Sequence, residues 1–299
     1  MRTKKLLSIV PVLAFLVISI TSLQAQIGIR FPSEKKTVKD PVTGTELTFL
    51  TSKPAGDSKI YQTHNQWTAD GNWVIFRSNR VKGEAMAVNE KTGTIVQVSE
   101  GGFTGMLNVA RKSMKLYFMR NLPAYQATQN RRGGPVQVIE VDLATLFADS
   151  ESGKLKPATA YQRICGTTPA EIGAGPSGLG MMNIKTGETK FVVAVPFQVG
   201  HIQANPWMPG EIVFCWETGG KAPQRTWTVM SDGSGLRPLY PESEYEWVTH
   251  ESIIADHPHP TFSADGTRIE IQSAMLSEDN KSMNICIIPV PEEWLKRKY

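Results

Sequence analysis

Short runs of β-prone residues, separated by turn sequences, recur along most of the chain. Residues 67–76 contain an Asp70-Gly71 turn between two such runs, and residues 260–271 repeat the pattern around Asp265-Gly266. An Asp-Gly pair between β-prone runs is a strong signal for a β-hairpin. The hydrophobic pattern therefore predicts antiparallel strand pairs at both ends of the chain.

Further hairpins lie between these two. A Lys-Thr-Gly turn at residues 91–93 and another at 185–187 each separate two strand-like runs, and more runs follow at 107–120, 211–216 and 226–230. Four short strands repeating about every 40 to 45 residues are typical of propeller blades, and no long helical periodicity competes with them. We predict an all-β fold: a β-propeller of four-stranded antiparallel blades, with five to six complete or partial blades.

The repeat is interrupted in two places. Between residues 171 and 178 the chain passes from the end of one unit into the second half of another, and only four residues separate Glu251 from Asp256. We interpret both as missing hairpins. The loop at 125–135 carries Arg131 and Arg132, which either meet an anionic ligand at the propeller face or are solvated loop charges.

The first 25 residues have the features of a secretory signal peptide. Arg2, Lys4 and Lys5 precede an apolar run at residues 6–20 that is too short and interrupted to span a membrane stably. We expect a leader at 1–25, an entry segment at 26–57 that closes or leads into the domain, and a propeller domain at 58–299. The mature protein is expected to be exported, and to lie in the periplasm.

Charge and cysteine content exclude several classes of protein. Removal of the leader takes three of the positive charges and lowers the formal net charge from +4 to +1, which argues against nucleic acid or an anionic membrane as a partner. Cys165, Cys215 and Cys286 are widely spaced and odd in number. They predict neither a disulfide framework nor a cysteine-type zinc site, and we interpret them as buried thiols.

The histidines offer a candidate metal site. His257 and His259 flank Pro258, and His250 lies just upstream. Alternate residues of an extended segment point the same way, so His257 and His259 form a plausible preorganised pair of metal ligands. Taken alone, the motif more often marks histidines that simply line a loop.

Residues 199–251, together with residues 256–291, resemble the oligogalacturonate lyase family, propellers that cleave pectin fragments by β-elimination. The residues that carry the resemblance are Gly200-His201-Ile202-Gln203, Asn205-Pro206-Trp207, Phe214-Cys215-Trp216-Glu217, Arg225-Thr226-Trp227, Asp232-Gly233-Ser234, Val248-Thr249-His250-Glu251 and His257-Pro258-His259-Pro260-Thr261-Phe262-Ser263. The family is seven-bladed. A weaker, TolB-like similarity extends back to residue 58.

The resemblance implies a divalent cation, Mn²⁺ in the family, held by His250, His257 and His259. The family's fourth ligand is a glutamine, and Ile254 stands at its position here. Imidazole also suits zinc, iron and nickel, so the ligand type alone does not identify the ion.

The resemblance also implies roles for residues outside the metal site. The family's histidine base falls on His201, for which a positioning role is the alternative. Arg225 is a candidate partner for the substrate carboxylate or a member of a structural salt bridge. Gln203 and His64 are candidate substrate-binding residues, although a structural role is the alternative for His64. The family's catalytic arginine matches no position in this chain.

The leading hypothesis is therefore an oligogalacturonate lyase that acts on oligogalacturonides with a metal cofactor. Two alternatives stay open: a non-catalytic TolB-like periplasmic propeller that binds a protein or glycan, and an inactive shortened paralogue. Fold alone does not separate them, because propellers host many functions.

Overall fold

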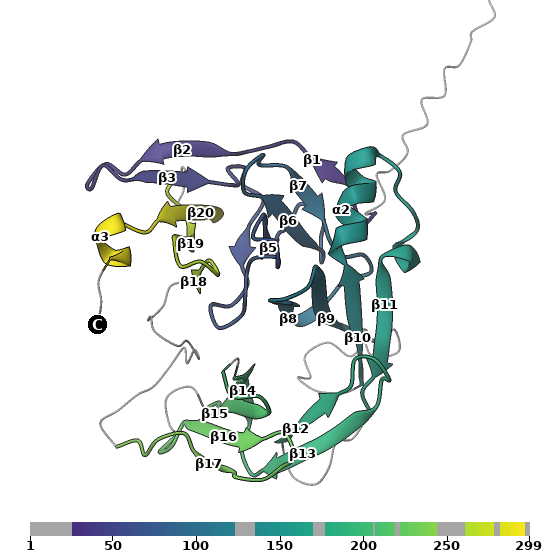
Figure 1. Cartoon of the computed structure of the whole chain (residues 1–299). Helices are drawn as coiled ribbons and strands as arrows, with labels where there is room; N and C mark the ends of the chain where they lie inside the picture. Colours follow the sequence, from purple (N-terminus) through teal and green to yellow (C-terminus); the bar gives the residue numbers. More distant parts are fainter. Residues whose placement is uncertain are drawn as a thin grey trace, which may run out of the picture.

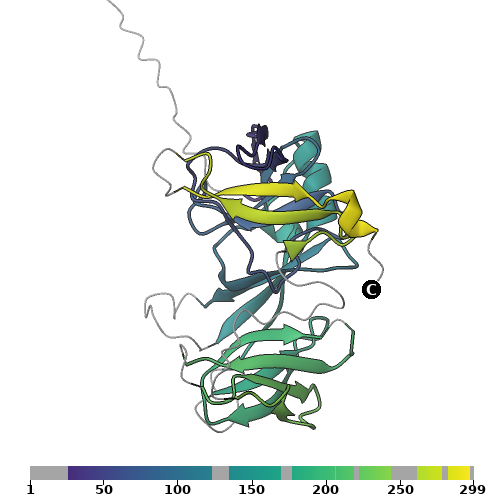
Figure 2. The same cartoon turned by 90° about the vertical axis from the view of Figure 1, so that its left-hand side faces the viewer.

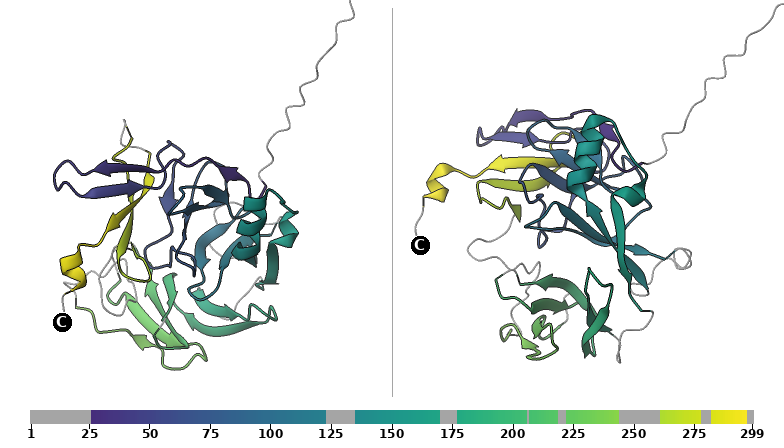
Figure 3. Two further views of the ribbon diagram at one scale, coloured as in Figure 1. Left: turned by 45° about the horizontal axis from the view of Figure 1, so that its top comes forward. Right: turned by 45° about the vertical axis from the view of Figure 1, so that its right-hand side comes forward.

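A computed structural model describes residues 26–122, 135–169, 177–205, 207–218, 222–243, 261–277 and 282–296. Within these residues the chain forms four antiparallel sheets of four or five strands and one two-stranded sheet. The sheets follow one another in chain order around a ring (Figures 1 and 3). The predicted all-β propeller is confirmed, with fewer blades than the seven of the lyase family.

The first two blades contain the largest core. The first blade has the order β1-β7-β6-β5-β4 and the second the order β11-β10-β9-β8. Their strands are β1 (Arg30–Phe31), β4 (Ser58–Lys59), β5 (Trp73–Arg77), β6 (Ala85–Asn89), β7 (Ile95–Gln97), β8 (Thr104–Val109), β9 (Lys115–Asn121), β10 (Val136–Asp142) and β11 (Gln162–Thr167).

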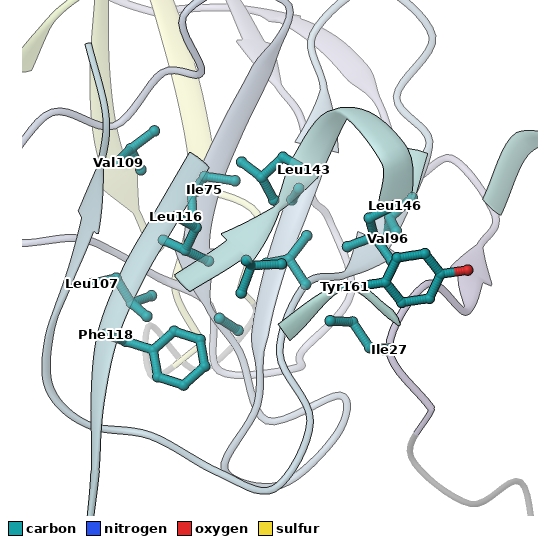
Figure 4. Packing of buried hydrophobic residues seen from close by; sticks show 14 of the residues in the cluster. Ile27, Ile75, Val96, Leu107, Val109, Leu116, Phe118, Leu143, Leu146 and Tyr161 are labelled. Carbon is teal, nitrogen blue, oxygen red and sulfur yellow. The ribbon is translucent and has the colours of Figure 1, made fainter. Parts of the chain in front are cut away.

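Helix α2 (Leu143–Ser152) and the 3₁₀ turn η1 (Ala158–Ala160) lie between β10 and β11. The Asp142 side chain accepts a hydrogen bond from the Thr145 N–H and caps the start of α2, and Gly153 ends the helix at φ 68°. The helix packs its apolar side, with Leu143, Leu146 and Phe147, against the first two blades (Figure 4). It closes the outer end of their shared core.

The two-stranded sheet and the next blade lie on the opposite side of the ring (Figure 2). Their strands are β12 (Ser177–Met182), β13 (Thr189–Val195), β14 (Val199–Ala204), β15 (Glu211–Trp216), β16 (Thr226–Met230) and β17 (Arg237–Pro238). The β12–β13 sheet is the half blade expected after the first interruption of the repeat. It packs on the β14–β17 blade through a core that includes Leu179, Phe197 and Phe214.

The last blade is built from strands near both ends of the described chain. Its strands are β18 (Thr261–Phe262), β19 (Arg268–Ser273) and β20 (Asn284–Pro289), continued by β3 (Glu46–Phe49) and β2 (Lys36–Lys39) and followed by α3 (Glu292–Leu295). Cys286 lies opposite Phe49 in the ladder. Residues 26–57, expected as an entry segment, thus supply strands to two blades.

The two largest apolar cores lie between neighbouring blades. One core joins the first and second blades, and another joins the last blade to the first through Ile285, Ile287, Trp67 and Phe76. No helix in the described ranges is long and apolar enough to cross a membrane. The predicted leader at residues 1–25 lies outside those ranges.

The interface between the last and first blades also contains a buried carboxyl group. Glu270 of β19 has no exposed surface, and neither of its carboxyl oxygens has a hydrogen-bond partner. Burial raises the pKa of Glu270 to about 8; Lys59 opposes this shift and Glu90 adds to it. Below the unfolded-state pKa the carboxyl is neutral in both states and costs no stability. As pH rises from there toward 8, ionisation favours the unfolded state and the protein loses stability.

We therefore expect Glu270→Gln to stabilise the protein at pH 8 by roughly 1–3 kcal/mol and to have little effect at pH 4. The measurement is thermal or urea unfolding of both proteins at the two pH values. Glu46→Gln, an exposed change in the same sheet, is the matched control and should be neutral at both. An equal effect of Glu270→Gln at pH 4 and pH 8 would contradict the assignment.

Candidate functional site

The site is organised by an irregularity in β14. Gly200 pairs with Cys215 and Gln203 with Val213, so β14 has one more residue than β15 between the same two rungs. This extra residue is a β-bulge, which redirects side chains. His201 lies in the bulge with φ 47°, the one non-glycine residue with positive φ in the described part of the chain.

The bulge brings His201 to two side chains of β15 and its continuation. His201 Nε2 lies 3.3 Å from Glu217 Oε2, and Cys215 Sγ lies 3.6 Å from the same oxygen. Cys215 and Glu217 are alternate residues, so they share a face. The Cys215 thiol is fully buried, whereas the side chains of His201 and Glu217 are 19% and 26% exposed.

Gly200 leaves the space that the Glu217 carboxylate occupies. A Cβ added at residue 200 would lie 2.5 Å from Glu217 Oε2, well inside van der Waals contact. The Gly-His pair therefore combines a residue without a side chain and a residue with positive φ. Together they allow the imidazole and the carboxylate to meet across two strands.

Arg225, the residue directly before β16, approaches the same carboxylate. Its Nη2 lies 3.8 Å from Glu217 Oε2, and its Nη1 donates to the Trp216 carbonyl at 3.3 Å. Only 2% of Arg225 is exposed, and Glu242 accepts its backbone N–H at 2.9 Å. Glu217 therefore lies between an imidazole and a buried guanidinium.

A loop of the first blade reaches His201 from the other side of the ring. The Tyr61 and His201 rings meet edge to face, with centroids 5.1 Å apart. His64 follows in the same loop, and its Nδ1 lies 2.8 Å from Thr63 Oγ1. Burial lowers the pKa of His64, and the nearby His201 lowers it further, so His64 is neutral at pH 7.

A cavity of about 180 Å³ lies beside these residues, where the first two blades approach β14. Gln203, which is 7% exposed, lines it together with Thr63, His64, Asn65, Asn108, Val109, Arg111, Ile202 and Ala204. β8 and β14 lie toward the centre of the ring and β11 and β17 toward its rim (Figure 1). The cavity is thus central, which is where propellers commonly bind small molecules.

Four of the predicted site residues are therefore grouped. His201 and Arg225 meet through Glu217, and His64 and Gln203 line the adjoining cavity. The predicted metal ligands His250, His257 and His259, and Ile254 among them, lie outside the described residues. Sequence reasoning assigned no role to Glu217 or Cys215, although their alternate spacing in Phe214-Cys215-Trp216-Glu217 placed them on one face.

His201, Cys215 and Glu217 are also the one group of three potential metal ligands within the described ranges, with ligand atoms all within 4.8 Å of one another. Manganese prefers oxygen ligands, whereas a thiolate selects softer ions. This group therefore does not fit the manganese site that the lyase resemblance implies.

Comparison with known proteins supports the fold. No family model and no curated protein sequence matches the chain. Among solved structures, an oligogalacturonate lyase in complex with manganese aligns with a TM-score of 0.65 over 91% of this chain and 100% of its own, at 14% identity. The oligogalacturonate lyase of Vibrio parahaemolyticus aligns with a TM-score of 0.67 over 90% and 100%, again at 14% identity. The resemblance found in the sequence is thus confirmed by structure: this chain has the propeller fold of the oligogalacturonate lyases.

Proposed function

We propose that this chain is an oligogalacturonate lyase that cleaves α-1,4-linked oligogalacturonides by β-elimination. The observation that carries the proposal is the His201–Glu217 pair beside a central cavity, in a fold shared with two oligogalacturonate lyases. The signal-like leader supports action outside the cytoplasm, in the periplasm, on pectin fragments.

In the proposed reaction the His201 imidazole takes the proton from C5, which is α to the uronate carboxylate. The electron pair of that C–H bond forms the C4–C5 double bond, the C4–O bond breaks, and the leaving oxygen is protonated from solvent. Imidazole suits this step because it is basic and largely neutral near pH 7. Glu217, at 3.3 Å, stabilises the positive charge that the ring gains.

Arg225 has a positioning role in this proposal. Its guanidinium is almost completely buried and lies 3.8 Å from Glu217, so it holds the carboxylate against His201 rather than receiving a substrate carboxylate from solvent. Gln203 and His64 line the cavity and are proposed to bind the sugar hydroxyls.

A divalent cation, Mn²⁺ by the lyase resemblance, is proposed to bind His250, His257 and His259. When bound near a uronate carboxylate, such an ion stabilises the enolate-like charge that develops. The residues that the structure describes would supply the base, its carboxylate partner and the walls of the cavity.

The test is incubation of the mature protein with di- and trigalacturonate and MnCl₂, followed by the ultraviolet absorbance of the unsaturated uronide. We expect product with Mn²⁺, loss of the activity after chelation, and recovery when Mn²⁺ is restored. If no unsaturated product forms with either substrate in the presence of Mn²⁺, the lyase proposal fails. The open alternative would then be a propeller that binds without catalysis.

A further inference from the structure

We propose that His201 Nε2, Cys215 Sγ and a Glu217 carboxylate oxygen form a second cation site, selective for thiophilic divalent ions such as Zn²⁺. Nitrogen, thiolate and carboxylate donors are all common zinc ligands, and a set of three leaves a fourth position for water or another group. The three residues belong to the β14–β17 blade, and all three lie within the described ranges. It uses none of the three histidines that are proposed to hold manganese.

The observed spacing matches tetrahedral zinc. With ordinary Zn–N, Zn–O and Zn–S bond lengths, a tetrahedral centre places its nitrogen and oxygen ligands about 3.3 Å apart and its sulfur and oxygen ligands about 3.6 Å apart. The His201–Glu217 distance is 3.3 Å, and the Cys215–Glu217 distance is 3.6 Å. Two of the three distances between ligand atoms thus match tetrahedral zinc, and the third, between His201 and Cys215, lies within 4.8 Å.

Charge and access also favour binding. On metal binding the Cys215 thiol loses its proton, so the thiolate and the carboxylate together balance a dication beside the Arg225 guanidinium. The partly exposed side chains of His201 and Glu217 give the ion a route to the buried sulfur. Gly200 keeps this space open, since a Cβ there would overlap Glu217 Oε2.

A consequence follows that rests on the proposed lyase function. An ion bound at His201 Nε2 leaves the proton of the neutral ring on Nδ1, so the imidazole has no lone pair left to accept the C5 proton. Zn²⁺ should therefore inhibit the reaction even when Mn²⁺ is saturating. The lyase activity would thus be raised by Mn²⁺ and lowered by Zn²⁺.

The test uses Co²⁺ as a spectroscopic substitute for Zn²⁺, with the full mature chain and no substrate. We expect one equivalent of Co²⁺ to produce a strong sulfur-to-cobalt charge-transfer band that Zn²⁺ abolishes by displacement. In Cys215→Ser the band should disappear, and Zn²⁺ affinity should fall by more than about 100-fold. Cys165→Ser, which alters another buried thiol, is the matched control and should keep both.

Several results would overturn the proposal. One is the absence of a charge-transfer band in the parent protein, a result that does not depend on whether any variant folds. Another is a band that persists in Cys215→Ser. Because binding is measured without substrate, an inactive protein that binds Co²⁺ through Cys215 would refute only the lyase function. An active protein without the band would refute only this site.

Discussion

His201→Asn should lower kcat of the lyase reaction by about 10²–10⁴-fold, the usual contribution of a general base. Asparagine is the suitable replacement because it tolerates the positive φ of 47° at this position, whereas alanine would add backbone strain. Its amide also remains able to donate to Glu217. The measurement is steady-state kinetics on trigalacturonate with Mn²⁺, with circular dichroism to check the fold.

His64→Asn is the matched control, since it removes the neighbouring imidazole from the same region. A residue that lines the cavity should raise KM more than it lowers kcat. A kcat for His201→Asn within about threefold of the parent would show that His201 is not the base, because one lost general base costs far more. The propeller would then need another proton acceptor.

Arg80→Met should destabilise the protein by about 3–5 kcal/mol at pH 7, because it removes the buried cation that two buried carboxylates share. Arg80 Nη2 lies 2.6 Å from Glu34 Oε2, and Arg80 also contacts Asp57, whose side chain has no exposed surface. Glu34 additionally accepts backbone N–H groups from Ser52 and Lys53. This network links the N-terminal strands to the first blade.

The stability lost in Arg80→Met should depend on pH. Burial opposes ionisation of Glu34, but the Arg80 hydrogen bond and the two backbone donors outweigh it and lower its pKa. A lowered pKa means that the stabilisation is present above the unfolded value and is lost as pH falls. Urea unfolding should therefore show a smaller difference between parent and Arg80→Met at pH 4 than at pH 7.

Lys82→Met removes an exposed charge two residues away and serves as the control, with an expected change within about 0.5 kcal/mol. If Arg80→Met changed the free energy of unfolding as little as Lys82→Met, the network would contribute no net stability. A deficit that stayed constant from pH 7 to pH 4 would show that lost packing, rather than uncompensated charge, causes the effect.

The strands were predictable because the turns between them contain residues typical of tight turns. In both Asp-Gly repeats a hydroxyl donates to the aspartate two residues later, Thr68 to Asp70 and Ser263 to Asp265, each at 2.5 Å. Helix α2 was missed although Leu143, Leu146, Phe147 and Ser150 follow a helical spacing with Asp142 as cap. A single helix of this length is easily obscured where strand periodicity dominates the surrounding chain.

The candidate site was predictable only in part. His201 and Gln203 follow from a motif, but the contact of His201 with Glu217 depends on a bulge that shifts the register by one residue. The near-complete burial of Arg225 likewise depends on how its blade packs. Bulges and burial arise from tertiary structure, so residue types and spacing do not reveal them.

The shared last blade has a consequence for the order in which the protein folds. β3 gains its partner β20 only after almost the whole chain has been made, since Phe49 pairs with Cys286. Contacts so distant in sequence are slow to form and leave an early strand with an open edge. A circular permutant that places residues 261–296 directly before residue 26 would make this blade contiguous in sequence. We expect it to refold faster than the parent protein.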